Sequence, residues 1–380
     1  MKVWMIQNVI APYRIKLFER MAAEPGVNFE VILLARKMKN LPHWKVDFQQ
    51  LPFKAKVIPG ANIQIGYERI LCLNPGLLLR MFLERPDVVI CSGFSFATIG
   101  AFVYRLLGGG RYVIWWEGTE FTEGTRSRLR VTVRWLLIRF ASALVDAGKL
   151  SKQYLRSLLP SNSDIPFFTS YNCIESSRFR PDPLRSEELT SLREKFPGRT
   201  ILCVGQLVER KGVLKLLEVY GKLPEETKKD VGLVFVGKGP LEGEIRSYCK
   251  QHELNNVHLE GLVAYDRIPL YYWMSDLFVI LSTEDPNPLV IFEALTAGLP
   301  VVCSNRLGNA VDFVNNGENG FVVDPLHADQ IAVRIIEILG WSTSQRERSA
   351  AVSAGLVAKA NYDDAAAAFI DASRTAMARR

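Results

Sequence analysis

The feature that most constrains the fold is an alternation of short apolar runs with longer helical segments along the whole chain. Runs of strand length, such as VGLVFV at 231–236 and DLFVILS at 276–282, are apolar at nearly every position. Strands that are buried on both faces have this composition, and they occur in parallel sheets joined by crossover helices. The pattern therefore predicts an α/β protein with doubly wound parallel sheets.

The length of the chain indicates two such sheets. The chain has 380 residues, whereas a single hydrophobic core stops growing at about 250–300 residues. A polar stretch at 180–199 separates two alternating sets, and we interpret it as the linker between domains. We predict two Rossmann-like domains, at 1–182 and 195–360, that face each other across a cleft. The alanine-rich helix at 361–380 is expected to pack back on the first domain.

Charge is distributed unevenly between the halves. Residues 1–180 carry 25 Lys and Arg against 13 Asp and Glu, a net +12, and the remainder carries 22 against 27, a net −5, which together give +7. A basic first half predicts an anionic partner. A phospholipid surface or a lipid diphosphate fits this charge, and on charge alone nucleic acid fits it as well.

A helix expected at 125–140 is the candidate for membrane contact. Arg126, Arg130 and Arg134 recur at four-residue spacing, and other positions carry apolar side chains. A basic amphipathic helix of this kind lies on an anionic membrane. The alternative is a core-packed helix with a solvated basic face.

Several site classes find no support in the sequence. The six cysteines form no CxxC pair, which favours reduced core thiols in a cytosolic protein. The four histidines have no metal-ligand spacing, no Asp-x-Asp occurs, and we expect neither a metal nor a bound cofactor. No apolar run reaches the about 18 residues of a membrane span, and no signal peptide is recognisable. The expected location is cytoplasmic, with peripheral attachment to the membrane left open.

Two acids, Asp285 and Glu293, bracket the loop PNPLV at 286–290 before an apolar helix. Free N–H groups at a helix start bind phosphate, and carboxylates accept hydrogen bonds from sugar hydroxyls. The spacing therefore suits a nucleotide-sugar whose diphosphate lies between the two acids. Acids that only stabilise a helix N-terminus are the alternative. The residues expected at this helix entrance are Asn287, Pro288, Leu289 and Val290.

Two further loops strengthen the interpretation. VGQLVERKG at 204–212 places Lys211 at the start of a helix, where an ammonium beside free N–H groups binds a diphosphate. FVGKGPLEGE at 235–244 carries Gly237 in a turn that is GxGxxxG rather than the dinucleotide-binding GxGxxG, which is a weak signal by itself. A lysine on a solvated surface remains the alternative for Lys211.

Taken together, these strings resemble the retaining glycosyltransferases of family four, which have the GT-B fold. The resemblance covers most of 200–330 and, more loosely, the first half of the chain. The matching strings are VGQLVERKG, FVGKGPLEGEI, NNVHLEGLV, YYWMSDLFVILSTEDPNPLVIFEALTAGLPVV and NNGENGFVVDP, with RPDVVICSG, WWEGTE and YNCIESSRFRP in the first half.

The resemblance implies roles for residues of the second half. Glu293 would contact the ribose hydroxyls and Asp285 the donor hexose, although the adjacent Glu284 leaves open which side chain reaches the sugar. Lys211 would bind the diphosphate. The basic residue that the family has five positions earlier is replaced here by Gln206, so Lys211 should matter more. The base is expected to be bound by backbone around Leu262.

The first half departs from the family pattern at two places. The loop in which the family often has a glycine pair reads NVIAPYR and contains Pro12, Tyr13 and Arg14. Arg14 either restores the charge that Gln206 lacks, holds an anionic acceptor, or is a surface arginine. The active-site His of the family is replaced by Glu117, which either orients or deprotonates the acceptor hydroxyl or is structural.

These observations predict a metal-independent, retaining glycosyltransferase. Its partners would be a UDP-, GDP- or TDP-type sugar donor and a saccharide or lipid-linked acceptor in cell-surface polysaccharide synthesis, and we expect no nucleic acid. The alternatives are a nucleotide-sugar epimerase with the same fold and a non-catalytic membrane-binding protein.

Overall fold

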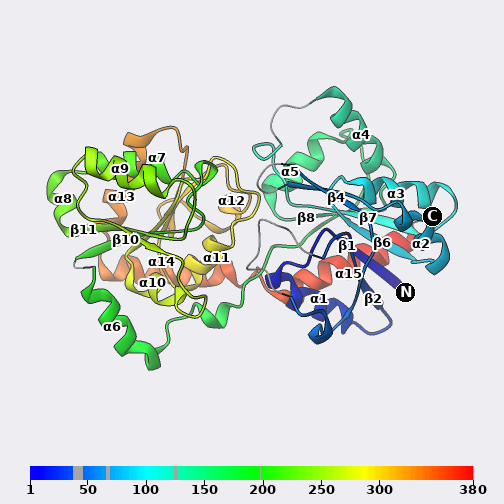
Figure 1. The fold of residues 1–380 in the computed structure, drawn as a ribbon, viewed down its shortest axis with the longest axis horizontal. Coiled ribbons are helices and arrows are strands. Elements are labelled where there is room, and N and C mark those ends of the chain that lie inside the picture. Colours follow the sequence, from blue (N-terminus) through cyan, green and yellow to red (C-terminus); the bar gives the residue numbers. More distant parts are fainter. Residues whose placement is uncertain (37–45, 66–68, 124–126, 197, 380) are drawn as a thin grey trace. The chain divides into compact units, whose positions relative to one another are not determined.

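The computed structural model describes residues 1–36, 46–65, 69–123, 127–196 and 198–379. Contacts divide the chain into two compact units, which are considered one at a time below (Figure 1). The first comprises Met1–Cys173 with Ala360–Arg380, and the second comprises Ile174–Lys359. Each unit is built on a parallel sheet, which confirms the predicted α/β class with two doubly wound sheets.

The first unit contains a seven-stranded parallel sheet in the order β3-β2-β1-β6-β7-β8-β9. A separate antiparallel pair, β4–β5, lies outside this sheet. From β1 the chain adds β2 and β3 on one side of the sheet, and it later adds β6 on the other side of β1. The boundary between β1 and β6 is therefore a topological switch point. The strands are β1 (Lys2–Gln7), β2 (Asn28–Leu33), β3 (Lys54–Val57), β4 (Ala61–Ile65), β5 (Arg69–Leu73), β6 (Val88–Ser92), β7 (Arg111–Trp116), β8 (Ala143–Asp146) and β9 (Phe167–Thr169).

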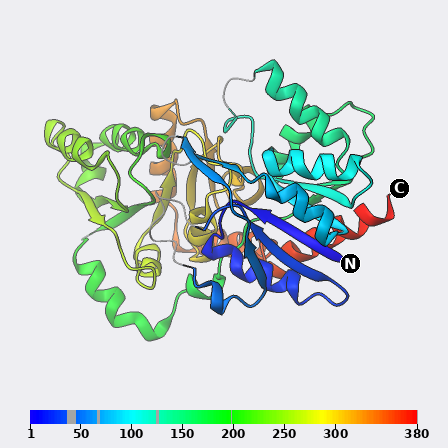
Figure 2. The ribbon, with the colours of Figure 1, turned by 45° about the vertical axis from the view of Figure 1, so that its right-hand side comes forward.

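Helices cover both faces of this sheet, as Figure 2 shows. Alternate residues of β1 point to opposite faces: Val3 and Met5 join one core cluster, and Trp4 and Ile6 join the other. The first face is covered by α1 (Ile15–Ala22) and by α15 (Tyr362–Ala378), whose small alanines pack closely on the sheet. The other face is covered by α2 (Gly76–Glu84), α3 (Phe96–Leu106), α4 (Arg128–Arg139) and α5 (Lys149–Ser157).

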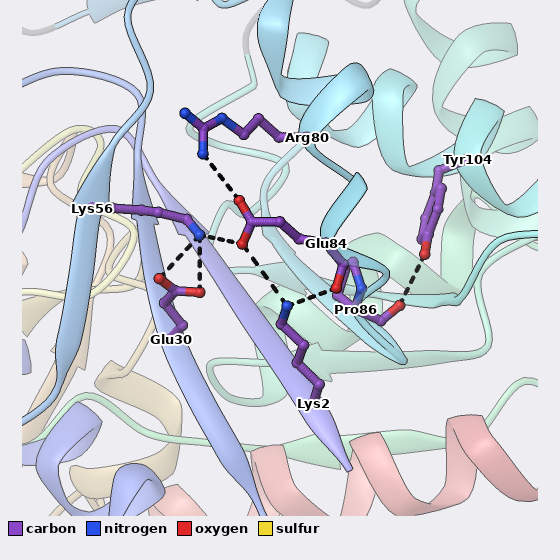
Figure 3. Close-up of polar contacts among 7 residues, drawn as sticks. All are labelled: Lys2, Glu30, Lys56, Arg80, Glu84, Pro86 and Tyr104. Carbon is purple, nitrogen blue, oxygen red and sulfur yellow. Dashed lines mark hydrogen bonds and ion pairs between the residues drawn. The ribbon is translucent and has the colours of Figure 1, made fainter. Parts of the chain in front are cut away.

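An ion network ties the start of β1 to β2, β3 and the end of α2 (Figure 3). Lys56 Nζ lies 3.1 Å from the carboxylate of Glu30 and 2.5 Å from Oε2 of Glu84. Lys2 Nζ donates to the Glu84 carbonyl at 2.6 Å, and Arg80 pairs with the Glu84 carboxylate at 3.2 Å. Partial burial raises the pKa of Glu84, but the hydrogen bonds from Lys56 and Arg80 outweigh it and the pKa is lowered. The network joins three cations to two carboxylates, and we assign it a structural role.

The second unit contains a six-stranded parallel sheet in the order β12-β11-β10-β13-β14-β15. Its switch point lies between β10 and β13, because β10 leads to β11 on one side and β13 leads to β14 on the other. The strands are β10 (Arg199–Val204), β11 (Val231–Val236), β12 (Val257–Gly261), β13 (Leu277–Ile280), β14 (Val301–Ser304) and β15 (Gly320–Val323).

The main core cluster of the second unit joins this sheet to α7, α9 and α13. A second group of helices, α6, α10, α11 and α14, is linked by helix–helix contacts. The helices of the unit are α6 (Ser186–Glu194), α7 (Val213–Gly221), α8 (Glu225–Asp230), α9 (Glu242–Gln251), α10 (Ile268–Met274), α11 (Leu289–Thr296), α12 (Ala310–Phe313), α13 (Ala328–Leu339) and α14 (Thr343–Val357).

The linker interpretation of 180–199 is wrong, because α6 forms within it. Leu192 is buried, and the Arg193 guanidinium donates to the Trp273 carbonyl at 3.1 Å, so α6 is anchored on α10. The chain enters the second unit earlier than the predicted boundary at 182. Phe179 is fully buried, and its carbonyl accepts a hydrogen bond from Trp273 Nε1 at 2.8 Å. The high charge of the stretch reflects the exposed face of a helix.

Among the described residues, none of the helices combines the length and the apolarity that crossing a bilayer requires. The six cysteines are free thiols, all buried except for the half-buried Cys249, as expected for core thiols.

Candidate functional site

The switch point of the second unit brings together two residues that the sequence places far apart. Lys211 ends a short 3-10 helix, Glu209–Lys211, after β10, and Asp285 lies in the loop after β13. The Lys211 ammonium bonds the Asp285 carboxylate, and Arg210 Nη1 lies 3.9 Å from the same oxygen. Since both loops leave the carboxyl ends of neighbouring strands, this is where such sheets bind ligands.

Backbone geometry fixes the position of Lys211. Gly212, the next residue, is in the left-handed region with φ of +67°, and a Cβ there would lie 2.1 Å from the carbonyl oxygen of Leu281. A side chain at Gly212 would therefore push the loop away from β13. Thr283 N donates to the Arg210 carbonyl at 2.8 Å, which ties the two loops together from the other side.

The pairing of Lys211 has a consequence for anion binding. Only 9% of the Asp285 side chain and 16% of the Lys211 side chain are exposed, so the pair is largely shielded from water. An anion that reaches the ammonium would compete with the Asp285 carboxylate for it. The sequence predicted that Lys211 is available to a diphosphate. In the structure Lys211 is paired with Asp285, so binding a diphosphate would replace one anionic partner with another.

The start of α11 carries polar groups that lack protein partners. Pro288 is the N-cap and has extended backbone, and no side chain caps the helix. Asn287 is only 8% exposed, and neither polar atom of its side chain has a hydrogen-bond partner. A buried polar group without a partner costs about 1–3 kcal/mol. Together with the first N–H groups of α11, at the half-buried Leu289 and Val290, this amide makes the helix start suited to a polar ligand.

Glu293 lies in the middle of α11 and is almost entirely buried, with 9% exposed. Tyr272 donates a hydrogen bond from its hydroxyl to Glu293 Oε2 at 2.7 Å. Burial raises the pKa of Glu293 to about 7, although the hydrogen bond from Tyr272 lowers it. Burial therefore favours the protonated carboxyl well above the ordinary pKa of 4.5.

The glycine turns at the ends of β10 and β11 are in close backbone contact. Gly237 has φ of +142°, and a Cβ there would lie 1.9 Å from the Gly205 carbonyl oxygen. Gly205 N donates to the Val236 carbonyl at 2.9 Å. The predicted glycine-rich turn therefore holds two loops in close contact at the edge where Lys211 lies.

The remaining predicted residues of this half lie at the same edge. Gln206 is half-buried in the loop after β10. Leu262 follows the last residue of β12, and 76% of its surface is exposed. The carbonyl of the preceding Gly261 accepts a hydrogen bond from Gly237 N at 2.8 Å.

In the first unit, the loop after β1 meets the end of β7. Pro12, Tyr13 and Arg14 form a 3-10 helix, and Glu117 directly follows β7. Arg14 Nη2 donates to both carboxylate oxygens of Glu117, at 2.8 and 2.9 Å, and Nη1 donates to Gln7 Oε1 at 2.8 Å.

Electrostatics stabilise this pair. The Arg14 guanidinium stacks over Trp115 at 4.3 Å from the ring centre. Burial lowers the pKa of Arg14, but the charges and hydrogen bonds of Glu117 and Tyr13 together raise it by more, so the pKa is raised overall. Arg14 is thus neither a surface arginine nor a free cation: its charge is matched by Glu117, and the two predicted residues form one element.

The expectation of a continuous basic face at 125–140 is wrong at Arg134. Its side chain is only 11% exposed, pairs with the Glu123 carboxylate and lies over the ring of Trp116. A guanidinium next to an aromatic ring gains a cation–π attraction as well as packing contacts. The four-residue spacing of the arginines does not reveal such a contact. Arg130 is exposed, as expected, and Arg126 lies outside the described residues.

Sequence reasoning missed three polar residues of these sites. Tyr272 donates to Glu293, Gln7 accepts from Arg14, and Asn309 donates from Nδ2 to the Pro288 carbonyl at 3.0 Å. None has a sequence spacing that points to its partner. Within the described ranges, no group of three His, Cys, Asp or Glu lies close enough to hold a metal ion.

Known proteins resemble both the sequence and the fold. Residues 186–352 match the family described as Glycosyl transferases group 1. Over 294 residues, 73% of this chain, the sequence is 28% identical to the GDP-mannose-dependent alpha-(1-6)-phosphatidylinositol monomannoside mannosyltransferase of Mycobacterium tuberculosis, and the match spans 66% of that protein.

Solved structures extend the likeness to the whole chain. The Anabaena protein HepE, solved in complex with UDP, has a TM-score of 0.74 at 19% identity and covers 98% of each chain. Sucrose-phosphate synthase from Thermosynechococcus elongatus has a TM-score of 0.76 at 16% identity and covers 100% of each chain. At this level of identity the likeness shows the fold, and it confirms the expected GT-B architecture.

Proposed function

Because the chain belongs, through residues 186–352, to the glycosyl transferases group 1, we propose that it transfers a hexose from a nucleoside diphosphate sugar to an acceptor hydroxyl. The second unit binds the donor, and the first binds the acceptor. The proposed reaction retains the anomeric configuration and needs no metal ion.

The observation that carries this proposal is the meeting of Lys211, Asp285 and the start of α11 at one switch point. A diphosphate needs a cation and N–H donors, and a sugar needs carboxylate acceptors. All three kinds of group are present at this edge of the sheet, and buried Asn287 adds an amide without a partner.

The chemistry follows from these groups. Lys211 and the α11 N-terminus stabilise the negative charge that develops on the departing diphosphate, which is usually the largest catalytic contribution. When the ammonium turns to the diphosphate, the Asp285 carboxylate is released to accept hydrogen bonds from the donor hexose. Glu293 accepts hydrogen bonds from the ribose.

On the acceptor side, we assign Glu117 the role of orienting the acceptor hydroxyl, with Arg14 holding its carboxylate in place. Both oxygens of Glu117 accept from one guanidinium nitrogen, so the carboxylate has a single orientation. Proton removal from the hydroxyl by Glu117 would require this pair to loosen first.

The proposed acceptor is a saccharide or a lipid-linked saccharide used in cell-surface polysaccharide synthesis. A relative whose name includes a phosphatidylinositol-based acceptor supports the lipid class. The proposed location is cytoplasmic, peripheral on an anionic membrane. The outward face of α4 supports this, because it combines exposed Leu129 and Trp135 with exposed Arg128, Arg130 and Arg139.

The donor class is tested by a thermal-shift panel of UDP, GDP, TDP and ADP, each with and without its sugar. We expect one base to raise the melting temperature, and we expect Lys211→Ala to reduce that shift. Conversion of a sugar donor without any acceptor would instead indicate an epimerase. Binding to anionic vesicles with no shift by any nucleotide would indicate a non-catalytic membrane protein.

A further inference from the structure

An apolar groove between α2 and α3 opens at the carboxyl edge of the sheet in the first unit. It has a volume of about 400 Å³, within the range of small-molecule sites, about 300–1,000 Å³. Its walls include Leu34, just after β2, Leu73 at the end of β5, and Leu77 on α2. Phe96 and Ile99 on α3 line the opposite side.

Two of these apolar side chains are unusually exposed. Phe96 is 50% exposed and Ile99 is 40% exposed, although both line a concave surface. Burying such side chains under an apolar ligand stabilises a complex by about 25 cal/mol for each Å² removed from water. The groove is therefore suited to an aliphatic chain.

Asn74 is a polar side chain in the groove lining, and its amide nitrogen has hydrogen-bond partners whereas its amide oxygen has none. Its Nδ2 donates to the carbonyls of Leu34 and Ile58, at 3.0 and 2.7 Å, which fixes the amide in the wall. Its buried Oδ1 has no hydrogen-bond partner. A ligand hydroxyl that reached this oxygen would supply the missing hydrogen bond, which favours an amphiphile over a hydrocarbon.

The position of the groove connects it to the Arg14–Glu117 pair. The α3 wall begins four residues after the end of β6, where the Ser95–Thr98 capping box starts the helix. β6 is the direct neighbour of β7 in the sheet, and Glu117 directly follows β7. Adjacent strands are about 4.8 Å apart, so the α3 wall of the groove follows the strand next to the one that Glu117 follows, at the same edge of the sheet.

We propose that this groove binds the aliphatic chain of an amphiphilic acceptor, whose hydroxyl-bearing head reaches toward Glu117. The inference rests on the proposed function and narrows its acceptor to the lipid-linked class. A second copy of this chain is the other occupant that the experiment separates.

The test uses n-alkyl β-D-glucosides from methyl to decyl, titrated calorimetrically into the full chain below their micelle concentrations and without nucleotide. Full burial of each methylene predicts up to about fourfold tighter binding. We expect affinity to rise with chain length until the groove is full and then to level off.

Gly100 provides the variant that fills the groove. It lines the groove on α3, and a Cβ built there meets nothing within 4 Å, so the first carbon of the Gly100→Leu side chain fits without a clash. The matched control is Gly355→Leu on α14, where a Cβ also meets nothing within 4 Å. Gly100→Leu should remove the dependence on chain length, and Gly355→Leu should leave it unchanged.

A second variant protects the test against misfolding. Ile99→Glu places a charge on the exposed groove wall and should weaken decyl glucoside at least tenfold while leaving methyl glucoside unaffected. Affinity independent of chain length in the unmodified protein, or an unchanged chain-length series in both variants, would overturn the proposal. A doubled mass that is lost in Gly100→Leu would assign the groove to a second copy and also overturn it. A nucleotide shift with a flat glucoside series would reject the groove and leave the proposed function standing.

Discussion

Arg14 Nη2 lies 2.8 Å from Oε1 of Glu117, although the two residues are 103 positions apart in the chain. The contact joins the loop after β1 to the end of β7, on either side of β6 in the sheet. Two departures from the family pattern thus compensate each other. The resemblance implies a glycine pair in the loop that contains Arg14 and a histidine in place of Glu117, and here each of the two side chains supplies the countercharge for the other.

Glu117→Gln should lower transfer about 100-fold while leaving the nucleotide affinity within about twofold. The amide keeps the size of the side chain but loses the charge that holds Arg14 and the acceptor hydroxyl. The measurement is the transfer rate beside calorimetric binding of the nucleotide identified by the thermal-shift panel. Glu120→Gln, at an exposed acid three residues away, is the control. Full transfer activity in Glu117→Gln would remove Glu117 from the site.

Lys211→Ala should lower turnover by about 100–1,000-fold, because one preorganised charge on the leaving group is lost and Gln206 offers no second cation. Turnover is measured as nucleoside diphosphate release in the presence of acceptor. The control is Lys215→Ala on α7, which removes a lysine paired with Glu218 at 2.9 Å. Near-normal turnover in Lys211→Ala would reject the assigned role.

Asp285→Asn should change affinity and activity in opposite directions. In the unmodified protein the Asp285 carboxylate competes with a diphosphate for the Lys211 ammonium. Removing its charge should therefore tighten nucleoside diphosphate binding several-fold and should lower transfer, because the hexose loses its acceptor. Calorimetry and product formation measure the two effects. Weaker diphosphate binding in this variant would show that the Asp285 carboxylate does not compete with the diphosphate for Lys211.

Glu293→Ala should weaken nucleoside diphosphate binding by about 10- to 100-fold, the range for losing a hydrogen bond to a charged group. Tyr272→Phe serves as the matched control, since it removes only the hydroxyl that donates to the same carboxylate. Its effect on affinity should be smaller. If calorimetry gives the same affinity for Glu293→Ala as for the unmodified protein, the ribose contact is wrong.

The pH dependence of stability should report the burial of Glu293. Its pKa in the folded protein is about 7, above the ordinary value of 4.5, because burial disfavours the charged form. The folded state therefore binds more protons than the unfolded state between these values. The free energy of unfolding should fall as pH rises from about 4.5 to about 7, by at most about 3 kcal/mol.

Urea unfolding across this pH range, compared with Glu293→Gln, isolates the contribution of Glu293. The variant cannot titrate at this position, so the difference between the two proteins should change across the window and level off above it. Parallel curves for the two proteins would contradict the raised pKa.

Much of the fold and of the donor half could be predicted from the sequence. The alternation of buried strands and crossover helices predicts doubly wound parallel sheets, and loops after strands carry the ligand groups. This reasoning selected Lys211, Asp285 and Glu293 as candidate donor-site residues, and they stay predictions. It missed Tyr272, because a hydrogen bond across two helices leaves no periodic signal, and it mistook α6 for a linker, because the exposed face of that helix is as polar as a loop.

By itself, the sequence determined which residues are apolar, where the strands end and which groups follow them, because these depend on local pattern. Only the tertiary structure decided which charges meet. Lys211 pairs with Asp285, Arg14 with Glu117, and Arg134 with Glu123 and aromatic rings rather than with solvent. Each pairing depends on the spacing of strands and helices packed in three dimensions, and a charge in a sequence carries no information about the distance to its partner.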